Sequence, residues 1–125
     1  MTNRLADIQQ QLMGTFFEEA VEALTQIESG LLSLEKCQDD PSRIHELVND
    51  VFRAAHSIKG GAATFGLTPI AELAHSAETL LDRLRSGSVA PNAEITALLL
   101  ATVDALRALV NWSSTGWDGV LGGGD

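Results

Sequence analysis

Residues 40–73 of the chain read DPSRIHELVNDVFRAAHSIKGGAATFGLTPIAEL, and they contain one complete predicted helix and the start of the next. The pair Asp40-Pro41 is typical of a helix N-cap followed by proline in the first turn. Apolar residues then recur every three or four positions as far as Gly66, a residue type that often follows a helix. This stripe consists of Leu47, Val51, Ala55, Ile58, Ala62 and Phe65.

Similar stripes lie on both sides of this stretch and predict further helices. The pair Thr68-Pro69 repeats the cap-plus-proline signal and opens a helix that ends near Gly87, with apolar positions at Ile70, Leu73, Ala77, Leu80, Leu81 and Leu84. An earlier helix over about residues 5–36 carries Ile8, Leu12, Phe16, Ala20, Leu24, Ile27, Leu31 and Leu34. The last helix follows Asn92 and carries Ile95, Leu98, Leu99, Thr102, Leu106 and Leu109.

Four amphipathic helices with short connections predict an all-α protein that folds as an antiparallel up-down four-helix bundle. The last helix is expected to fade near Trp112, whose side chain would cover the end of the bundle. We therefore predict one domain over residues 1–112, followed by a loose glycine-rich tail or linker start over 113–125, with room for a short extra helix there.

The composition fits one globular domain in a reducing compartment. The chain has 125 residues, 45% of them hydrophobic, and its single cysteine, Cys37, cannot form an internal disulfide or a cysteine-based metal site. No apolar run reaches the roughly 18 residues of a bilayer span, and the polar start lacks the apolar core of a secretory signal. We expect a cytoplasmic protein that has no metal site and does not insert into a membrane.

The charge balance argues against a nucleic-acid partner. Eight basic residues face 17 acidic ones, and the net charge of −9 repels phosphate backbones and anionic membranes. The chain also lacks a GxxxxGK[ST] loop and a strand that leads into a GxGxxG turn, and it is too short for a kinase core. Any ATP must therefore be bound by a separate domain.

A histidine in the second predicted helix points away from the predicted core. At about 100° per residue, the apolar stripe of this helix falls within about 40° of the direction of Val51, whereas His56 lies about 140° away. His56 is therefore expected in solvent. His45 lies three turns earlier on nearly the same face, but no motif surrounds it, and we assign it to the solvated surface.

Small residues cluster just after His56 on the same helix. Gly60 and Gly61 together cost a helix about 2 kcal/mol relative to alanines, and Ala63 follows them closely. Such a flat surface would let the active site of a partner approach the exposed ring. Lys59, one turn from the histidine, adds a positive charge suited to phosphoryl oxygens, and Phe52, one turn before it, is a candidate for the docking surface.

The third predicted helix supplies polar groups that can complement this histidine. Glu78 lies at the flank of its apolar stripe, about 100° from Ala77, and His75 lies about 160° from Ala77. If this flank faces the second helix, Glu78 can accept a hydrogen bond from Nδ1–H of His56. Nε2 then keeps a free lone pair, which makes it a nucleophile that can carry a phosphoryl group.

The motif RAAHSIKGGAATFG at residues 53–66 resembles the signature of the histidine phosphotransfer (HPt) domain family, most closely that of the P1 domains of CheA-type chemotaxis histidine kinases. The segments FFEEAVEALTQIESGLLSLE and HSAETLLDRLRSGSV also resemble the first and third helices of that family, so the resemblance covers about residues 10–112. It implies a phosphoacceptor role for His56, with Lys59, His75 and Glu78 as its polar network.

The resemblance also implies the partners of this domain. In the family, a separate histidine kinase catalytic domain transfers the phosphoryl group from ATP to the histidine. The group then moves to an aspartate of response regulators of the CheY and CheB types, and Mg²⁺ is bound by the kinase and the regulator. The domain would thus bind no cofactor, would not be an enzyme on its own, and would belong to a sensor histidine kinase, a transferase whose catalytic domain lies elsewhere.

Two departures from the family pattern stand out. Family members commonly have glycine where this chain has Ala63, and P1 domains often have a fifth helix, for which residues 113–125 lack the pattern. Two other functions stay open from the residues alone. The chain could be a helix-bundle interaction module that is never phosphorylated, or a stand-alone enzyme that uses His56 as nucleophile or base, although no convergent pocket or metal-ligand set is visible.

Overall fold

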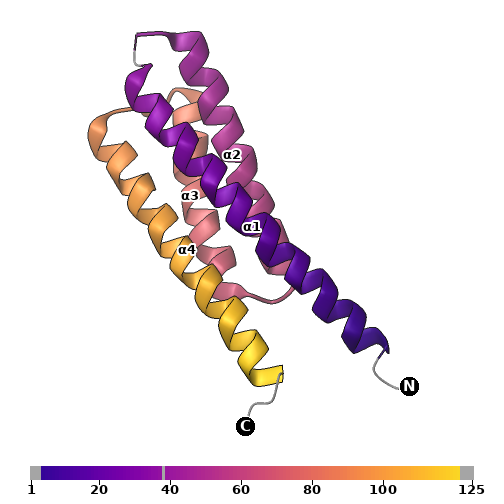
Figure 1. Cartoon of the computed structure of the whole chain (residues 1–125). Helices are drawn as coiled ribbons and strands as arrows, with labels where there is room; N and C mark the ends of the chain where they lie inside the picture. Colours follow the sequence, from indigo (N-terminus) through magenta and orange to yellow (C-terminus); the bar gives the residue numbers. More distant parts are fainter. Residues whose placement is uncertain (1–3, 38, 122–125) are drawn as a thin grey trace.

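The computed structural model describes residues 4–37 and 39–121, with side chains described as far as residue 115. These residues form four helices and no strand: α1 (Arg4–Lys36), α2 (Pro41–Thr64), α3 (Thr68–Ser86) and α4 (Ala93–Leu121). Figure 1 shows them side by side and alternating in direction, with α1 packed on α2 and α4, and α3 packed on the same two helices. The predicted all-α up-down bundle is confirmed.

The connections follow the predicted turn residues with one exception. The Asp40 carboxylate accepts a hydrogen bond from the backbone N–H of Arg43 at 3.2 Å and caps α2. After α2 the chain reverses through Gly66, whose φ of +70° favours glycine. The prediction that Thr68 caps α3 is wrong: Leu67 occupies the cap position without a side-chain hydrogen bond, and α3 begins at Thr68.

The core fills the space between the four helices, and the stripes of α2 and α3 lie close to their predicted positions. In α1, however, the predicted core residues Ile8 and Leu12 are 45% and 56% exposed. Figure 1 shows the reason, because the first turns of α1 extend past the connection between α2 and α3 and have no helix to cover them. The buried stripe of α1 consists of Met13, Phe16, Phe17, Ala20, Leu24, Ile27, Leu31 and Leu34.

The buried face of α4 differs from the predicted one. Leu98 is 58% exposed, and the residues that face the core are Thr96, Leu99, Val103, Leu106 and Val110. Leu99 and Leu106 are buried as predicted. The predicted residues Ile95, Thr102 and Leu109 are only partly buried, and in each case the residue that follows is buried instead. Apolar residues occupy several sides of α4, so their spacing does not single out one face.

The predicted end of the last helix near Trp112 is also wrong, because α4 continues to Leu121. Residues 113–121 of the predicted loose tail are therefore helical, and residues 122–125 lie outside the described part. Trp112 is 74% exposed and does not cover the bundle end. The described residues contain no fifth helix, and no described helix is both long and apolar enough to cross a bilayer. The domain boundary at residue 112 stays a prediction.

Candidate functional site

His56 lies on the outer side of α2, as predicted, and its side chain is 62% exposed. Its Nδ1 atom is hydrogen-bonded to Oε2 of Glu78, which comes from α3. The two helices pack directly on each other, so the flank of α3 that carries Glu78 does face α2. The predicted histidine–glutamate contact is therefore present in the structure.

Glu78 is the centre of the polar cluster and its most buried member. Its carboxylate accepts a hydrogen bond from Nζ of Lys59 at 2.6 Å, and Nδ1 of His75 lies 3.6 Å from its Oε1 atom. Burial by itself raises the pKa of Glu78, because it opposes ionisation. The hydrogen bonds and the charges of Lys59 and His56 outweigh this effect, so the pKa of Glu78 lies below its ordinary value. The four predicted polar residues thus meet at one carboxylate that is ionised at neutral pH.

This hydrogen bond fixes the chemistry of the imidazole. An ionised carboxylate can only accept, so Nδ1 of His56 must carry the proton. In the neutral ring Nε2 is then unprotonated, and its lone pair is free for attack. The arrangement of a nucleophilic nitrogen, an orienting carboxylate and a nearby ammonium suits transfer of an anionic group, with Lys59 placed to attract it.

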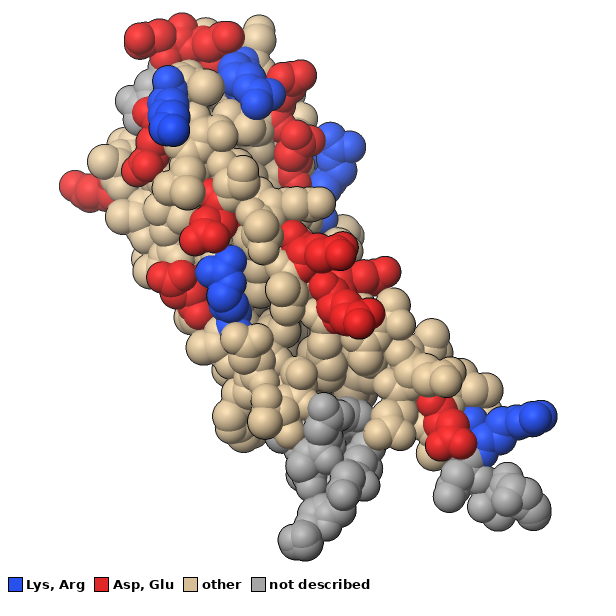
Figure 2. Space-filling view, in the orientation of Figure 1, with Lys and Arg blue, Asp and Glu red and all other residues tan. Residues whose placement is uncertain are grey.

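The cluster lines a shallow hollow of about 420 Å³ on the α2–α3 face. Phe52 forms one side of it, with its ring nearly parallel to that of His56 at an angle of 11° and a centroid distance of 6.2 Å. The remaining lining residues are Thr79, Asp82 and Arg85. On the face of the bundle that Figure 2 shows, acidic side chains outnumber basic ones. The hollow itself contains two cations, Lys59 and Arg85, beside the carboxylates of Glu78 and Asp82.

The small residues after His56 divide between two faces of α2. Gly60 and Ala63 are exposed, and a Cβ atom added to Gly60 would meet nothing within 4 Å. Gly61 lies about 140° around the helix from His56 and faces α1, where an added Cβ would come within 2.5 Å of the Phe16 ring. Close packing of α1 on α2 therefore accounts for Gly61, whereas Gly60 leaves open space on the side of His56.

These two neighbouring glycines are expected to differ in the sign of their effect on stability. Gly60→Ala should raise the free energy of unfolding by up to about 1 kcal/mol, because alanine is the better helix former and the site has room. Gly61→Ala should lower it by about 1–3 kcal/mol, because the Phe16 ring must move. Urea unfolding followed by circular dichroism measures both, and a stabilised Gly61→Ala variant would contradict the packing described above.

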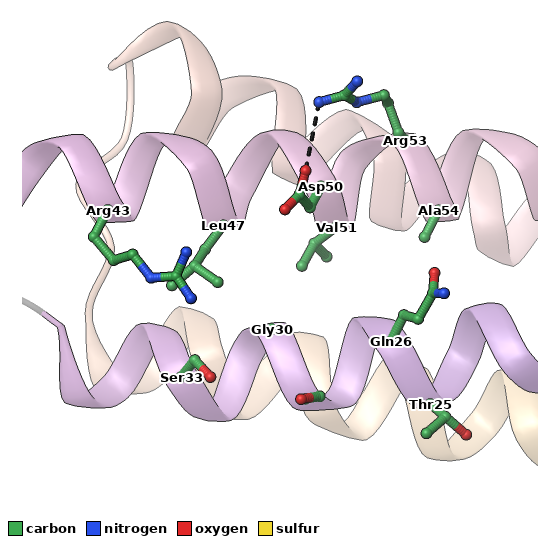
Figure 3. Close-up of a pocket in the computed structure, with 11 residues that line it drawn as sticks. Thr25, Gln26, Gly30, Ser33, Arg43, Leu47, Asp50, Val51, Arg53 and Ala54 are labelled. Carbon is green, nitrogen blue, oxygen red and sulfur yellow. Dashed lines mark hydrogen bonds and ion pairs between the residues drawn. The ribbon is translucent and has the colours of Figure 1, made fainter.

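A larger groove of about 780 Å³ lies elsewhere, between α1 and α2 (Figure 3). Figure 3 shows Val51 of α2 pointing at Gly30 of α1, and an added Cβ at Gly30 would come within 2.6 Å of Val51. The guanidinium of Arg53 points away from the groove toward Asp50. None of the predicted site residues lines this groove, so size alone does not mark the functional site, whereas the convergence of polar groups does.

Asp82 and Arg85 are two residues of the hollow that the sequence analysis missed. They follow Glu78 at positions i+4 and i+7 of α3, on the same flank of the helix. Projection of the whole α3 sequence onto a helical wheel, with Glu78 as the reference, would have placed them beside the histidine. No group of three or more metal-ligating side chains occurs among the described residues, and the predicted lack of a metal site stays a prediction.

The low pKa of Glu78 predicts how stability depends on pH. A carboxyl group whose pKa is lower in the folded state stabilises the fold above its unfolded pKa of about 4.3 and loses this effect as the pH falls through the folded value. The difference in unfolding free energy between wild type and Glu78→Gln should therefore be largest near neutral pH and should shrink below about pH 4. Urea unfolding of both proteins at several pH values measures this difference in unfolding free energy.

The matched control for this experiment is Glu72→Gln, which removes an exposed carboxylate from the same helix. Because exposed charges contribute little to stability, its curve should follow that of the wild type. A Glu78→Gln curve that stays parallel to the wild-type curve down to about pH 3 would show that the carboxylate is not stabilised by its partners.

Comparisons with known proteins agree with this fold. The model of the Hpt domain family matches residues 11–109. The chemotaxis protein CheA of Rhizobium meliloti is 46% identical over 101 residues, which are 81% of this chain and 13% of CheA. CheA of Salmonella typhimurium is 46% identical over 93 residues, which are 74% of this chain and 13% of CheA. The chain thus spans about an eighth of the length of the curated relatives it matches.

Two solved structures share the architecture. The phosphorylated P1 domain of CheA3, solved in complex with CheY6 from R. sphaeroides, superposes with a TM-score of 0.76 and 28% identity over 85% of this chain and 80% of that one. The CheA phosphotransferase domain from Thermotoga maritima superposes with a TM-score of 0.73 and 34% identity over 82% of this chain and 93% of that one. Since the family model spans most of the bundle and these domains share its fold, the chain belongs to the Hpt, or histidine phosphotransfer, domain family.

Proposed function

We propose that this domain carries a phosphoryl group on His56 in two-component chemotaxis signalling. It receives the group from an ATP-using histidine kinase catalytic domain and passes it to an aspartate of a response regulator. The observation that supports this best is an exposed imidazole whose Nδ1 is bound by Glu78, so that Nε2 faces outward with a free lone pair. The domain is a carrier and not a complete enzyme.

Loading of the histidine is a displacement at phosphorus. Nε2 of His56 attacks the γ-phosphorus of ATP, an N–P bond forms, and the bond from the γ-phosphorus to the β,γ-bridging oxygen breaks to release ADP. The ring keeps its Nδ1 proton, and the positive charge that develops on it is stabilised by the Glu78 carboxylate. Lys59 attracts the phosphoryl oxygens from one turn along α2.

When the histidine is unloaded, Nε2 is the leaving group instead of the nucleophile. A carboxylate oxygen of the regulator's aspartate attacks the phosphorus, an O–P bond forms, the N–P bond breaks, and Nε2 recovers its lone pair. Kinase and regulator contribute Mg²⁺ and the remaining catalytic groups, so this domain needs only to present the ring. The open space over Gly60 and the exposed Ala63 leave room for both partners, with Phe52 at the edge of the contact.

The comparisons support the choice of partners. A related P1 domain has been solved in phosphorylated form with CheY6, and the full-length relatives are chemotaxis proteins. We extend the regulators to the CheB type and place the kinase catalytic domain, with its ATP, on the same or another chain. We also propose a cytoplasmic location, in keeping with the single free cysteine.

The decisive experiment incubates the domain with a CheA kinase core and γ-labelled ATP and then adds a CheY-type regulator. A carrier acquires label that is stable in alkali and labile in acid, and it loses this label to the regulator. A stand-alone enzyme would act on ATP without the kinase core. An interaction module would stay unlabelled while an established P1 domain is labelled in parallel, and this result would overturn the proposal.

A further inference from the structure

A chain of stacked side chains reaches His56 from α3 by a route that does not involve Glu78. The guanidinium of Arg85 lies over the ring of Phe52, with its Cζ atom 4.0 Å from the ring centroid. The same guanidinium is held by Asp82, whose carboxylate accepts a hydrogen bond at 2.6 Å. Phe52 in turn lies nearly parallel to the imidazole of His56.

This arrangement matters because few contacts restrain the exposed histidine. One hydrogen bond from Nδ1 defines an axis but leaves the ring able to rotate about it. An aromatic face one turn away on α2 limits this rotation only if it is itself fixed, and Phe52 is half-buried at the edge of the hollow. A planar cation over its ring, anchored on the neighbouring helix, supplies that restraint.

We propose that Arg85 is a positioning residue for phosphorylation, acting through Phe52 to hold the His56 imidazole in the orientation that exposes Nε2. The ion pair with Asp82 is itself exposed and adds little stability, so its role is to orient the guanidinium. On this view α3 positions the histidine twice, by a hydrogen bond from Glu78 and by a stack from Arg85. The inference rests on the proposed function of His56.

The test is a double-mutant cycle between Arg85 and Phe52, with two readouts. The first is the rate of labelling by a CheA kinase core over a range of domain concentrations, which gives the maximal rate and KM. The second is the set of imidazole nitrogen and proton resonances of His56 in NMR spectra of the free domain. Arg85→Ala should slow labelling about threefold to fivefold with little change in KM, and it should shift the His56 resonances. Arg83→Ala is the control, because it removes an exposed arginine of the same helix that does not line the hollow.

The cycle separates positioning from a simple charge effect. In a Phe52→Leu background, Arg85→Ala should have almost no further effect on either readout, and Arg85→Lys should recover the rate only in part because ammonium does not stack as a plane. The inference would be overturned by any of three results. Arg85→Ala could slow labelling as much in the Phe52→Leu background as in the wild type, it could change only KM, or it could leave the His56 resonances unchanged. If the wild type takes no label, the proposed function fails, while the NMR comparison still decides the positioning.

Discussion

Replacing His56 with glutamine is expected to reduce labelling by a kinase core and ATP to background, a loss of at least about a hundredfold. An amide nitrogen has no basic lone pair and cannot form the phosphorylated intermediate. The amide can still donate to Glu78, and the position is largely exposed, so the melting temperature should stay close to that of the wild type. Labelling and thermal unfolding of the same preparation measure both effects.

His45→Gln is the matched control, because His45 is an exposed histidine of the same helix. Its imidazole lies near Asn49 and has no acidic partner from α3 among the described contacts. The His45→Gln variant should take label at the wild-type rate. If His56→Gln also kept its label, the phosphoryl group would reside on another side chain, and the proposed role of His56 would be wrong.

The contrast between α2 and α4 shows which parts of the fold a sequence can predict. In α2 the charged and polar residues leave one apolar stripe, and nearly all of its predicted members are buried. In α4 only Glu94, Asp104 and Arg107 carry charge over the described side chains, so the exposed Leu98 looks as apolar as the buried Val103. The glycines after residue 115 predict an end to the helix, but the described helix continues through Gly116 and Gly119.

The same limit applies to the site. The spacing along α2 and α3 was enough to place His56 in solvent and Glu78 at a flank, since both are properties of one helix. Contacts between side chains of different helices could be identified only from the coordinates. The spacing predicts Gly61 on the partner surface, whereas in the structure it packs on Phe16. A helical wheel can place Arg85 on the flank of Glu78, but the contact of its guanidinium with the Phe52 ring is seen only in the coordinates. Such contacts depend on the rotation of each helix against its neighbour.

The second large loss of phosphorylation is expected when Glu78 is replaced. Glu78→Gln keeps the size of the side chain but removes the charge that stabilises the ring as it becomes positive, and the amide can also donate to Nδ1 and favour the wrong tautomer. Phosphorylation by a kinase core should fall by on the order of tenfold to a hundredfold. Lys59 also loses its anionic partner, so its ammonium is less well fixed beside the ring.

Two measurements separate this role from a loss of stability. Initial labelling rates should be taken at a temperature well below the melting point of the variant, with Glu72→Gln as the exposed carboxylate control from the same helix. Nitrogen NMR should show His56 protonated on Nδ1 in the wild type and a larger share of rings protonated on Nε2 in Glu78→Gln. If the tautomer and the labelling rate both stayed at their wild-type values, Glu78 would be a structural ion-pair partner of Lys59 with no part in orienting the nucleophile.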